Sequence, residues 1–555
     1  MTGVKVALVT PPVAKASEVD PAVPVLVGFL RNKGVDAYPF DANLTFQEAL
    51  LSSDCLEGYA ASVAAKGNRA AATSAHRATH NVARALKRLK SPSGYSDYNR
   101  YRGSIGELNE GFRLASRALG CHITTSDFTH PHLSPLSSGD LALVGREPEE
   151  IQTSAALKSV AEKLLEGDPA IVGISISYLS QALHAFALSG LLKKAGFSGT
   201  LLAGGGLVHS WRPRITPSSR IFEIFDGVVS GPGEEALLAV SRSGKIVDSP
   251  GMLSPCYSIW NRTHSKGCVS FSPWGNTLRW DDYISPAPIL PLSASRGCYW
   301  AKCAFCPEAA GDRQPYVAAD GDALAMEVLK LRDAVGVRYL HLTDNALSPA
   351  HMRRFAERFK GESVKWYGFS RLEKQLAERG YLKALAEGGC KMLQLGIESA
   401  TPRLLKMMGK GNDLELTSTI VKKAAEAGIR VYGYFLFGLP TERYEEALAT
   451  VEWIKDHADS LTFLNLSLMN LPGGGEMEVS PESYGLTEVR EKDRRNDLSL
   501  YRDYSGAETL ERRELRKLLG EARRDPVVRK LIKQTPQGFS ANHGAFAPLI
   551  SGGGS

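Results

Sequence analysis

Three cysteines, Cys298, Cys303 and Cys306, lie close together in the run SASRGCYWAKCAFCPE at 293–308. Their Cys-x4-Cys-x2-Cys spacing puts three thiolates in one short loop, and three thiolates can hold three corners of an iron–sulfur cube. The fourth iron then has no protein ligand, so it can bind and reduce a substrate or cofactor. The alternative is a zinc knuckle, which usually needs a fourth Cys or His at a second close spacing. The next cysteine, Cys390, is far away in sequence, so the spacing favours the cluster.

The cysteine run follows an apolar segment, PILPLSAS at 288–295, which predicts a buried strand that ends in a loop. A helix is expected at 322–336, and further helical segments separate the strands that follow. We expect those strands at 338–347, 364–373, 389–400, 428–442 and 461–473. Six strands with helices between them match a partial barrel of parallel strands. In such barrels, active sites lie at the carboxyl ends of the strands.

The first 245 residues also alternate between strands and helices. Expected strands lie at 4–10, 35–43, 170–177, 199–206 and 225–231. This alternation predicts a parallel, doubly wound α/β sheet, in which ligands bind at the carboxyl ends of the strands. The candidate ligand-binding residues at those ends are Thr10, Pro11, Pro12, Ser175, Ser177, Tyr178, Gly204, Gly205, Gly206, Gly231, Pro232 and Glu234.

These strand ends suit a large ligand, because glycine allows close backbone approach. Serine hydroxyls and the N–H groups at helix starts can hold phosphate or amide groups. The loops contain neither a G-x-G-x-x-G dinucleotide fingerprint nor a Walker A sequence. Taken alone, the glycines also fit ordinary turns between strands and helices.

The cysteine loop after a strand resembles that of the radical S-adenosylmethionine (SAM) superfamily. The longer stretch DDYISPAPILPLSASRGCYWAKCAFC, together with VGFLRNKGVDAYPFDAN near the N-terminus, resembles the branch that carries a cobalamin-binding domain. The first spacer has four residues where three is commonest in the superfamily. The resemblance implies a Rossmann-like cobalamin-binding domain at 1–245 with a helical insertion at about 46–165. A linker at 246–284, a (β/α)6 partial barrel at 285–475 and a helical cap at 476–550 would follow.

The resemblance also implies a SAM site in the second domain. Asp344 and Asn345 end the second strand, where the family binds the SAM amino group; the usual Gly-Gly-Glu is replaced here. Carboxylate and amide oxygens accept hydrogen bonds from an ammonium. Arg371 could bind the SAM carboxylate in a fork, or form a surface ion pair instead. Further SAM contacts are implied for Phe305, Glu398 and Ser399, and for the backbone of Gly438, Leu439 and Pro440 around adenine.

The resemblance implies a cobalamin-dependent radical SAM methyltransferase with a [4Fe–4S] cluster, SAM and methylcobalamin as cofactors. It would methylate an unactivated carbon of a natural product or peptide, with flavodoxin or ferredoxin as electron donor. The Asp-x-His-x-x-Gly motif that supplies a lower cobalt ligand is absent, as it often is in the family. Alternatives are a cobalamin-dependent cyclisation or rearrangement, a polar methyl transfer, and a cobalamin carrier with an idle barrel.

Composition sets the broad class of protein. The chain has 555 residues, 43% hydrophobic and 23% charged, which predicts several globular domains. A net charge of +6 is too mild to indicate nucleic acid, and no apolar run is long enough to span a membrane. Only three of the eight cysteines cluster, which argues against a disulfide framework and for a reducing, cytoplasmic setting.

Some remaining features have structural explanations that we prefer. His76 and His80 lie four residues apart and could bind a metal, but a solvated helix face is favoured because no third ligand is near. Adjacent methionines at 407 and 408 indicate helix packing. The basic stretch 508–534 predicts helices broken near Pro526 that cap the barrel or bind an acidic partner. Asn542 and His543 could face the substrate, although a lone His is usually structural.

Overall fold

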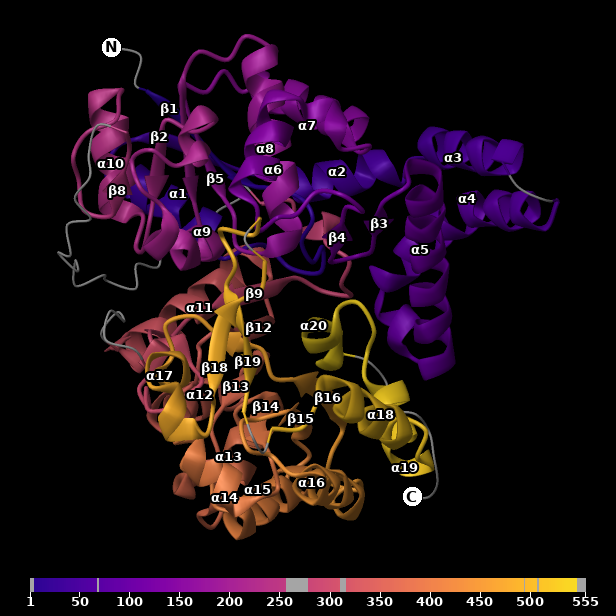
Figure 1. Ribbon diagram of the computed structural model, residues 1–555, viewed down its shortest axis with the longest axis vertical. Coiled ribbons are helices and arrows are strands. Elements are labelled where there is room, and N and C mark those ends of the chain that lie inside the picture. Colours follow the sequence, from indigo (N-terminus) through magenta and orange to yellow (C-terminus); the bar gives the residue numbers. More distant parts are fainter. Residues whose placement is uncertain are drawn as a thin grey trace. The chain divides into compact units, whose positions relative to one another are not determined.

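The computed structural model describes residues 4–66, 69–255, 278–309, 316–493, 495–506 and 509–546. The chain forms two compact units, shown in Figure 1. The first unit contains residues 1–288, 493–499 and 537–539, and the second contains 289–492, 500–536 and 540–555. The break at Pro288 lies close to the predicted start of the barrel at 285, and two short segments late in the chain belong to the first unit.

The first unit is built on a six-stranded sheet, and the predicted α/β class is confirmed. Its strand order is β2-β1-β5-β6-β7-β8, with all pairs parallel except the last. The order in which the strands are added to the sheet reverses between the parallel neighbours β1 and β5. The switch point of the sheet therefore lies at the carboxyl ends of these two strands. The strands are β1 (Lys5–Thr10), β2 (Asp36–Asp41), β5 (Ile171–Ser175), β6 (Thr200–Gly204), β7 (Gly227–Val229) and β8 (Met252–Leu253).

Helices cover both faces of this sheet. Its central strands are therefore buried along nearly their whole length. On one face, α1 (Ala22–Asn32) and α10 (Glu234–Ser243) share a hydrophobic cluster with the strands. The other face is covered by a second group of helices, which pack on one another (Figure 1). These are α2 (Ala42–Leu50), α6 (Ser138–Arg146), α7 (Ser154–Leu165) and α8 (Leu179–Lys194).

The helical insertion is shorter than predicted. Three mutually packed helices form it: α3 (Ser53–Lys66), α4 (Arg69–Leu89) and α5 (Tyr98–Leu119). The later part of the predicted insertion contains α6 and α7, which pack with α8 and α2 over the sheet. The preference for a solvated face at His76 and His80 is confirmed, since both side chains are exposed on α4.

The predicted linker at 246–284 is partly wrong. Its beginning forms β8, which pairs antiparallel with β7 and so extends the first sheet. Its end is fixed to the same unit, because the Tyr283 hydroxyl donates to Asp41 Oδ2 at 2.6 Å. The cysteines at 256 and 268 lie outside the described residues.

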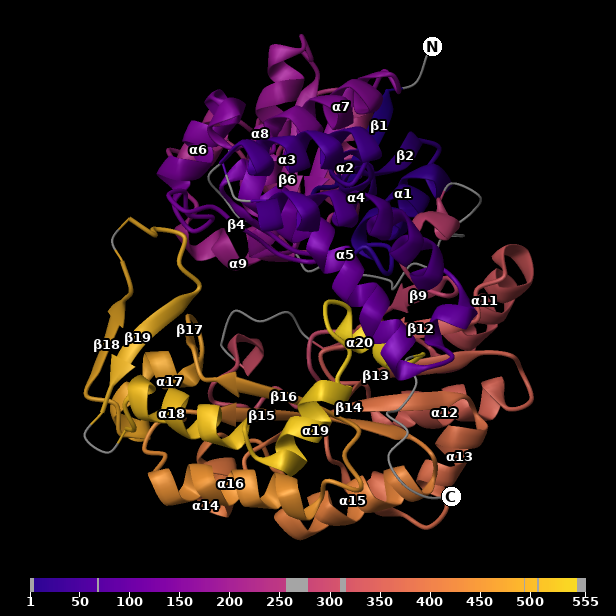
Figure 2. The same cartoon turned by 90° about the vertical axis from the view of Figure 1, so that its right-hand side faces the viewer.

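The second unit contains the predicted six parallel strands in sequential order. They pair as β9-β12-β13-β14-β15-β16, and β9 and β16 are the two edges, so the sheet is open. The helices that connect the strands line one face of the sheet (Figure 2). The strands are β9 (Ile289–Leu292), β12 (Tyr339–Leu342), β13 (Lys365–Ser370), β14 (Cys390–Glu398), β15 (Arg430–Phe437) and β16 (Phe463–Leu468). The connecting helices are α11 (Gly321–Val335), α12 (Pro349–Phe359), α13 (Tyr381–Glu387), α14 (Pro402–Met407), α15 (Leu414–Glu426) and α16 (Tyr444–Asp456).

The region after the barrel is not purely helical, as the cap was predicted to be. A three-stranded antiparallel sheet precedes the helices, in the order β17-β19-β18. The helices α18 (Arg512–Ala522) and α19 (Pro526–Gln534) then follow, separated just before Pro526 as expected. The strands are β17 (Leu471–Pro472), β18 (Glu488–Glu491) and β19 (Tyr501–Ser505), and a short helix, α17 (Glu476–Val479), lies between the first two.

A short final helix, α20 (Ser540–Gly544), packs against the barrel sheet through Ala541. Ala541 belongs to a cluster with side chains of four strands, from Tyr367 on β13 to Phe463 on β16. Asn542 and His543 are fully buried there. Among the described residues, no helix combines the length and the apolar character that crossing a membrane requires.

Helices α6 and α8 cross at two glycines, which gives a test of this packing. A Cβ on Gly190 of α8 would lie 2.0 Å from the carbonyl oxygen of Gly145 on α6. We therefore expect Gly190→Ala to destabilise the first unit by about 1–3 kcal/mol, the usual cost of overpacking. Gly103→Ala is the matched control, because Gly103 is exposed in α5 with no atom within 4 Å of its Cβ position. It should leave stability unchanged or raise it by up to about 1 kcal/mol. Denaturant unfolding of both variants would measure this, and equal effects would contradict the crossing.

Candidate functional site

The cysteine loop follows the first barrel strand, as predicted. Cys298, Cys303 and Cys306 are partly exposed and form no disulfide. The Cys306 N–H donates to the Cys303 carbonyl oxygen at 2.9 Å, which folds the second half of the loop into a turn. Burial raises the pKa of the Cys303 thiol and raises that of Cys306 to about 11, and the neighbouring cysteines add to both shifts. The three thiols are therefore unpaired and lie within one short loop.

This donor set has the chemistry of a cluster site. Three unpaired thiols lie in one loop, and soft thiolates are the ligands that iron–sulfur clusters use. Across the described parts of the chain, no three His, Cys, Asp or Glu side chains are already gathered as a metal site. The loop thus holds the thiols as neighbours, and a bound cluster would have to draw them to ligand distance.

Asp344 ties the second strand to the start of this loop. Its carboxylate accepts hydrogen bonds from the Ala294 N–H at 2.9 Å and the Ser295 hydroxyl at 2.5 Å. The side chain is buried, and burial raises its pKa. Asn345, its partner in the predicted amino-group site, is exposed. The structure thus separates the two environments: Asp344 is buried and braces the loop, and Asn345 is exposed.

The loop is held on another side by the segment that follows α14. The Ala304 N–H donates to the Met408 carbonyl at 2.8 Å, and Trp300 Nε1 donates to the Gly409 carbonyl at 2.9 Å. Gly409 has φ +64°, and a Cβ there would lie 2.3 Å from the Lys302 carbonyl oxygen, so only glycine fits. Met408 is fully buried and Phe305 packs partly buried in the same hydrophobic cluster. The expectation that Met407 and Met408 pack is confirmed, and Phe305 adjoins them.

Arg371 is buried, so the alternative of a surface ion pair is wrong. Only 3% of its surface is exposed. Its Nε donates to Glu373 at 2.9 Å, and one Nη donates to the Lys410 carbonyl oxygen at 2.6 Å. The predicted partner, the SAM carboxylate, would have to meet a guanidinium that already has these contacts.

Glu398 ends the fourth barrel strand and forms a buried ion pair that the sequence did not indicate. Its Oε1 accepts from Lys410 Nζ at 2.8 Å, and the two side chains are 12% and 6% exposed. Glu398 has φ +66°, which is uncommon for a residue other than glycine and often marks a functional site. Gly396 leaves room for the pair, because a Cβ there would lie 2.6 Å from Glu398 Oε1. Lys410 therefore belongs to the site.

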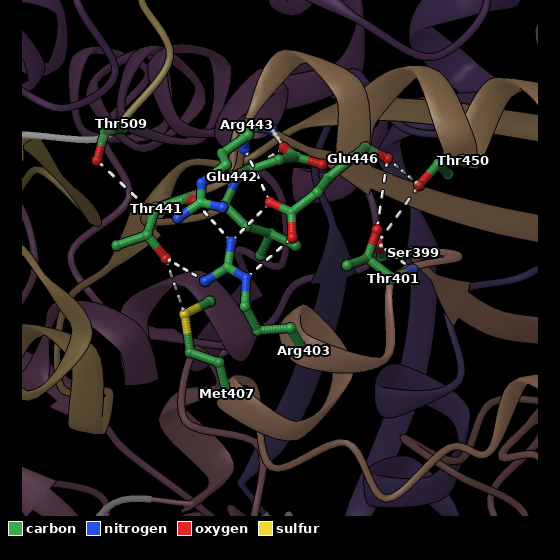
Figure 3. Close-up of polar contacts among 12 residues, drawn as sticks. Ser399, Thr401, Arg403, Met407, Thr441, Glu442, Arg443, Glu446, Thr450 and Thr509 are labelled. Atoms are coloured by element: carbon green, nitrogen blue, oxygen red, sulfur yellow. Dashed lines mark hydrogen bonds and ion pairs between the residues drawn. The ribbon is translucent and has the colours of Figure 1, made fainter.

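Ser399 belongs to a network of polar contacts with Thr401 and Thr450 (Figure 3). It is fully buried, lies 3.3 Å from the Thr450 hydroxyl, and accepts from the Thr401 N–H at 3.1 Å. In the same network, Arg403 forms two hydrogen bonds with Glu446, at 2.9 and 2.6 Å, and bonds Thr441 as well. These contacts give Ser399 a structural environment, and the predicted SAM contact remains a prediction.

The backbone of the fifth-strand motif is also committed to the protein. Glu442 Oε2 accepts hydrogen bonds from the Gly438 N–H and, at 3.1 Å, from the Leu439 N–H. The Gly438 carbonyl accepts from the Tyr504 hydroxyl at 2.6 Å. The two N–H groups that could have contacted adenine are thus already used. The neighbouring Pro440 has no N–H group to donate in their place. Sequence reasoning missed Glu442, although its position four residues after Gly438 in FGLPTE was a usable signal.

In the first unit, the predicted residues of the loops after β1 and β5 meet at the switch point. Gln181 on α8 connects the two strand-end loops there. Its Oε1 accepts from the N–H groups of Ser177 and Tyr178 at 2.8 and 3.0 Å, and its Nε2 donates to the Pro11 carbonyl at 2.8 Å. Thr10 beside this loop is buried. Gln181 was missed because nothing in its sequence setting distinguishes it from other helical residues.

One polar group at the switch point lacks a hydrogen-bond partner among the described residues. The Ser175 hydroxyl is buried and has no hydrogen-bond partner. Ser177 contacts Asp20 at 3.5 Å, and burial raises the pKa of Asp20 to about 6. Tyr178, in contrast, is 57% exposed. An orphaned hydroxyl next to an exposed aromatic ring is suited to a ligand at this edge.

The glycines after β6 leave an open surface. Gly205 has φ +100° and a Cβ there would lie 2.5 Å from the Ile176 carbonyl oxygen, so this position requires glycine. For Gly204 and Gly206, the nearest atoms to a Cβ would be 3.5 and 4.0 Å away. After β7, Gly231 and Pro232 lead into α10, whose first residue, Glu234, is buried. The predicted helix start is confirmed.

Comparison with known proteins identifies the second unit. Residues 292–454 match the model of the radical SAM superfamily. The chain is 26% identical over 344 residues to an uncharacterized methyltransferase of Pyrococcus horikoshii, covering 58% of this chain and 73% of that protein. It is 29% identical over 183 residues to cytidylyl-2-hydroxyethylphosphonate methyltransferase of Streptomyces wedmorensis, covering 31% and 34% of the two chains. The latter match thus spans only about a third of that relative.

Solved structures resemble nearly the whole chain in fold. The radical SAM methyltransferase TsrM from Kitasatospora setae, with cobalamin and a [4Fe–4S] cluster bound, has a TM-score of 0.57 at 15% identity, covering 96% of this chain and 93% of TsrM. The cobalamin-dependent radical SAM enzyme OxsB has a TM-score of 0.54 at 12% identity, covering 96% and 72%. At these identities the likeness concerns the fold.

Residues 292–454 of the second unit therefore form a radical SAM domain. The fold of the chain resembles that of TsrM and OxsB. The predicted family and fold class are confirmed.

The buried Glu442 gives the site a pH-dependent element. Burial raises the pKa of its carboxyl from 4.5 to about 7. Folding therefore favours the protonated form, and stability is lost as the pH rises from the unfolded towards the folded pKa. Gln can accept from the same two N–H groups without charge. We expect the Tm of Glu442→Gln, relative to the wild type, to increase between about pH 5 and pH 8.

Glu446→Gln is the matched control for this measurement. Its hydrogen bonds with Arg403 hold the pKa of Glu446 below its usual range. The stability that Glu446 contributes is therefore already complete above its unfolded pKa, so its Tm difference should stay constant over the same pH range. A flat or falling difference for Glu442→Gln would contradict a buried carboxyl with a raised pKa.

Proposed function

We propose that this enzyme is a cobalamin-dependent radical SAM methyltransferase that methylates an unactivated carbon of a small organic or peptide substrate. The observation that carries the proposal is the loop with three neighbouring, unpaired thiols at the end of the first strand of a radical SAM domain. The curated relatives named as methyltransferases support the reaction class. TsrM, whose structure with tryptophan bound has a TM-score of 0.55, supports a small substrate.

In the second unit, Cys298, Cys303 and Cys306 would hold a [4Fe–4S] cluster whose fourth iron binds SAM. When bound, these two groups supply reductive cleavage of SAM to a radical that abstracts hydrogen. The residues of the chain would orient SAM and shield it from water. Glu398, with Lys410, would offer a charged pair for the polar part of SAM, and Lys410 directly follows Gly409, whose carbonyl accepts from Trp300 of the cysteine loop. The tightly packed strand ends around Leu439 exclude water.

In the first unit, the switch point would hold cobalamin, which supplies the methyl group. Ser175 and Ser177 would hydrogen-bond its amide groups. Gly206 would give the corrin space, since the nearest atom to its Cβ position is the Ser177 carbonyl oxygen at 4.0 Å, and Gly204 would line the same edge. Gly231, Pro232 and Glu234 would line the neighbouring edge. An electron donor such as flavodoxin or ferredoxin would have to supply reducing equivalents.

An anaerobic assay of cluster-reconstituted protein tests this function. With SAM, reductant and methylcobalamin, we expect both 5′-deoxyadenosine and S-adenosylhomocysteine. Cys298→Ala should form no 5′-deoxyadenosine, because a cluster that lacks one of three ligands cannot present its open iron to SAM. Liquid chromatography with mass detection would quantify both products.

Each other product pattern points to a different function. S-adenosylhomocysteine alone would favour polar methyl transfer, and 5′-deoxyadenosine alone would favour cyclisation or rearrangement. Continued 5′-deoxyadenosine formation by Cys298→Ala would overturn the cluster assignment. Bound cobalamin without bound iron in the wild type would favour the carrier alternative.

The cobalamin site can be tested separately at Gly206. A Cβ at this position meets no atom closer than 4.0 Å, so Gly206→Phe should fold and place its ring over the proposed corrin site. We expect it to lose cobalamin, measured by absorbance after gel filtration, while its iron content equals that of the wild type. The matched control is Gly103→Phe, which makes the same change at an exposed position of α5. Full cobalamin binding by Gly206→Phe would place the cofactor elsewhere.

A further inference from the structure

Arg371 stacks on an aromatic side chain of the cysteine loop. Its guanidinium carbon lies 3.9 Å from the centre of the Trp300 ring. Trp300 is two residues after Cys298, within the four-residue spacer of the motif. A cation this close to a tryptophan face is attracted by the ring, and the attraction is larger where water is excluded. Arg371 is 3% exposed, so this contact is shielded.

The edges of the guanidinium are fixed as well. Nε donates to Glu373 and one Nη donates to the Lys410 carbonyl, so the plane cannot rotate without losing a hydrogen bond. Glu373 also accepts from the Tyr299 hydroxyl at 3.0 Å. The Arg371–Glu373 pair therefore contacts both residues that directly follow Cys298.

The segment after α14 completes the enclosure of Trp300. Its Nε1 donates to the Gly409 carbonyl, and a Cβ on Gly411 would lie 2.5 Å from the indole. Trp300 is thus held by its face, its N–H and its ring edge. Such contacts restrict a loop that would otherwise carry considerable conformational entropy.

We propose that Arg371 is a positioning residue that clamps the cysteine loop through Trp300 and Glu373, so that Cys298 is presented to the cluster. In this role Arg371 acts on the loop before SAM arrives, and the SAM carboxylate is bound by another group. The inference rests on the proposed function only in that the loop carries a cluster. The clamp consists of three contacts together: the stack of Arg371 on Trp300, the hydrogen bond from Arg371 to Glu373, and the hydrogen bond from Tyr299 to Glu373.

The test uses SAM-free, anaerobically reconstituted protein. Arg371→Lys keeps the charge but loses the flat face and the fork, and Trp300→Leu removes the ring from the loop side. Changes to residues that orient the metal ligands typically weaken metal binding about 10- to 100-fold, so we expect each variant to lose iron to a chelator about tenfold faster than the wild type. Absorbance at the cluster band, with total iron, follows the loss.

Matched controls separate this effect from general destabilisation. Arg353→Lys alters a similar cation–aromatic contact, with Tyr381 at 5.2 Å, on the outside of the same unit. It should lose iron at the wild-type rate. Tyr299→Phe removes only the hydrogen bond to Glu373, so it should fold and show a smaller acceleration in the same direction. Thermal unfolding of each iron-free variant shows whether it folds.

The double variant distinguishes a clamp from two independent effects. If Arg371 and Trp300 act through one contact, Arg371→Lys with Trp300→Leu should lose iron no faster than either single variant. If Arg371 instead binds the SAM carboxylate, Arg371→Lys would keep its iron at the wild-type rate and lose SAM affinity. That result, or a wild-type rate for Trp300→Leu, would overturn the proposal.

Failure of the clamp and failure of the proposed function give different results. A wild-type protein that binds no iron would reject the proposed function itself. A wild-type cluster with unchanged retention in both variants would reject only the clamp. A clamp with no methylated product would leave the positioning role intact in an enzyme of another radical SAM reaction.

Discussion

The candidate site depends on one constraint: three thiols must be held together on a loop that has little regular structure of its own. Fixing such a loop costs backbone entropy, and the protein offsets that cost with contacts from three directions. Asp344 fixes its start, the backbone of Met408 and Gly409 fixes its middle, and Arg371 fixes the first spacer. The fourth strand and the segment after it therefore matter as much to the cluster loop as the strand that precedes it.

Charge is concentrated around this loop in an unusual way. Most ion pairs of the described chain lie on the surface, where each contributes little. The pairs Lys410–Glu398 and Arg371–Glu373 are largely buried, and both lie near the cysteines. Burying such pairs is costly and rarely improves stability, so their retention is more readily explained by specific positioning. The uncommon backbone conformation of Glu398 at the same place points in the same direction.

The sequence predicted the features that depend on local pattern. Alternating apolar segments located the strands of both sheets, and the thiol spacing located the loop. It did not predict Gln181, Lys410 or Glu442, since their importance comes from partners brought together by folding. Arg371 was singled out as a SAM contact, which stays a prediction, and its burial could not be decided from one strand. The region of β18 and β19 was missed because its charged, turn-rich segments lack a clear alternation.

Both units contain a turn after a strand that one side chain fixes in the same geometry, but the two side chains differ in chemistry. In each, a side chain at position i+4 accepts from the N–H groups of residues i and i+1 at a strand end: Gln181 in the first unit and Glu442 in the second. The amide of Gln181 has a second function, since its Nε2 reaches the loop after β1. Glu442 has no such partner: its Oε1 is buried without a hydrogen bond. A charge there gains two N–H contacts but loses its hydration, and the desolvation dominates, as the raised pKa shows. A protonated Glu442 therefore resembles Gln181, and the pinned turn, rather than the charge, is what the two strand ends share.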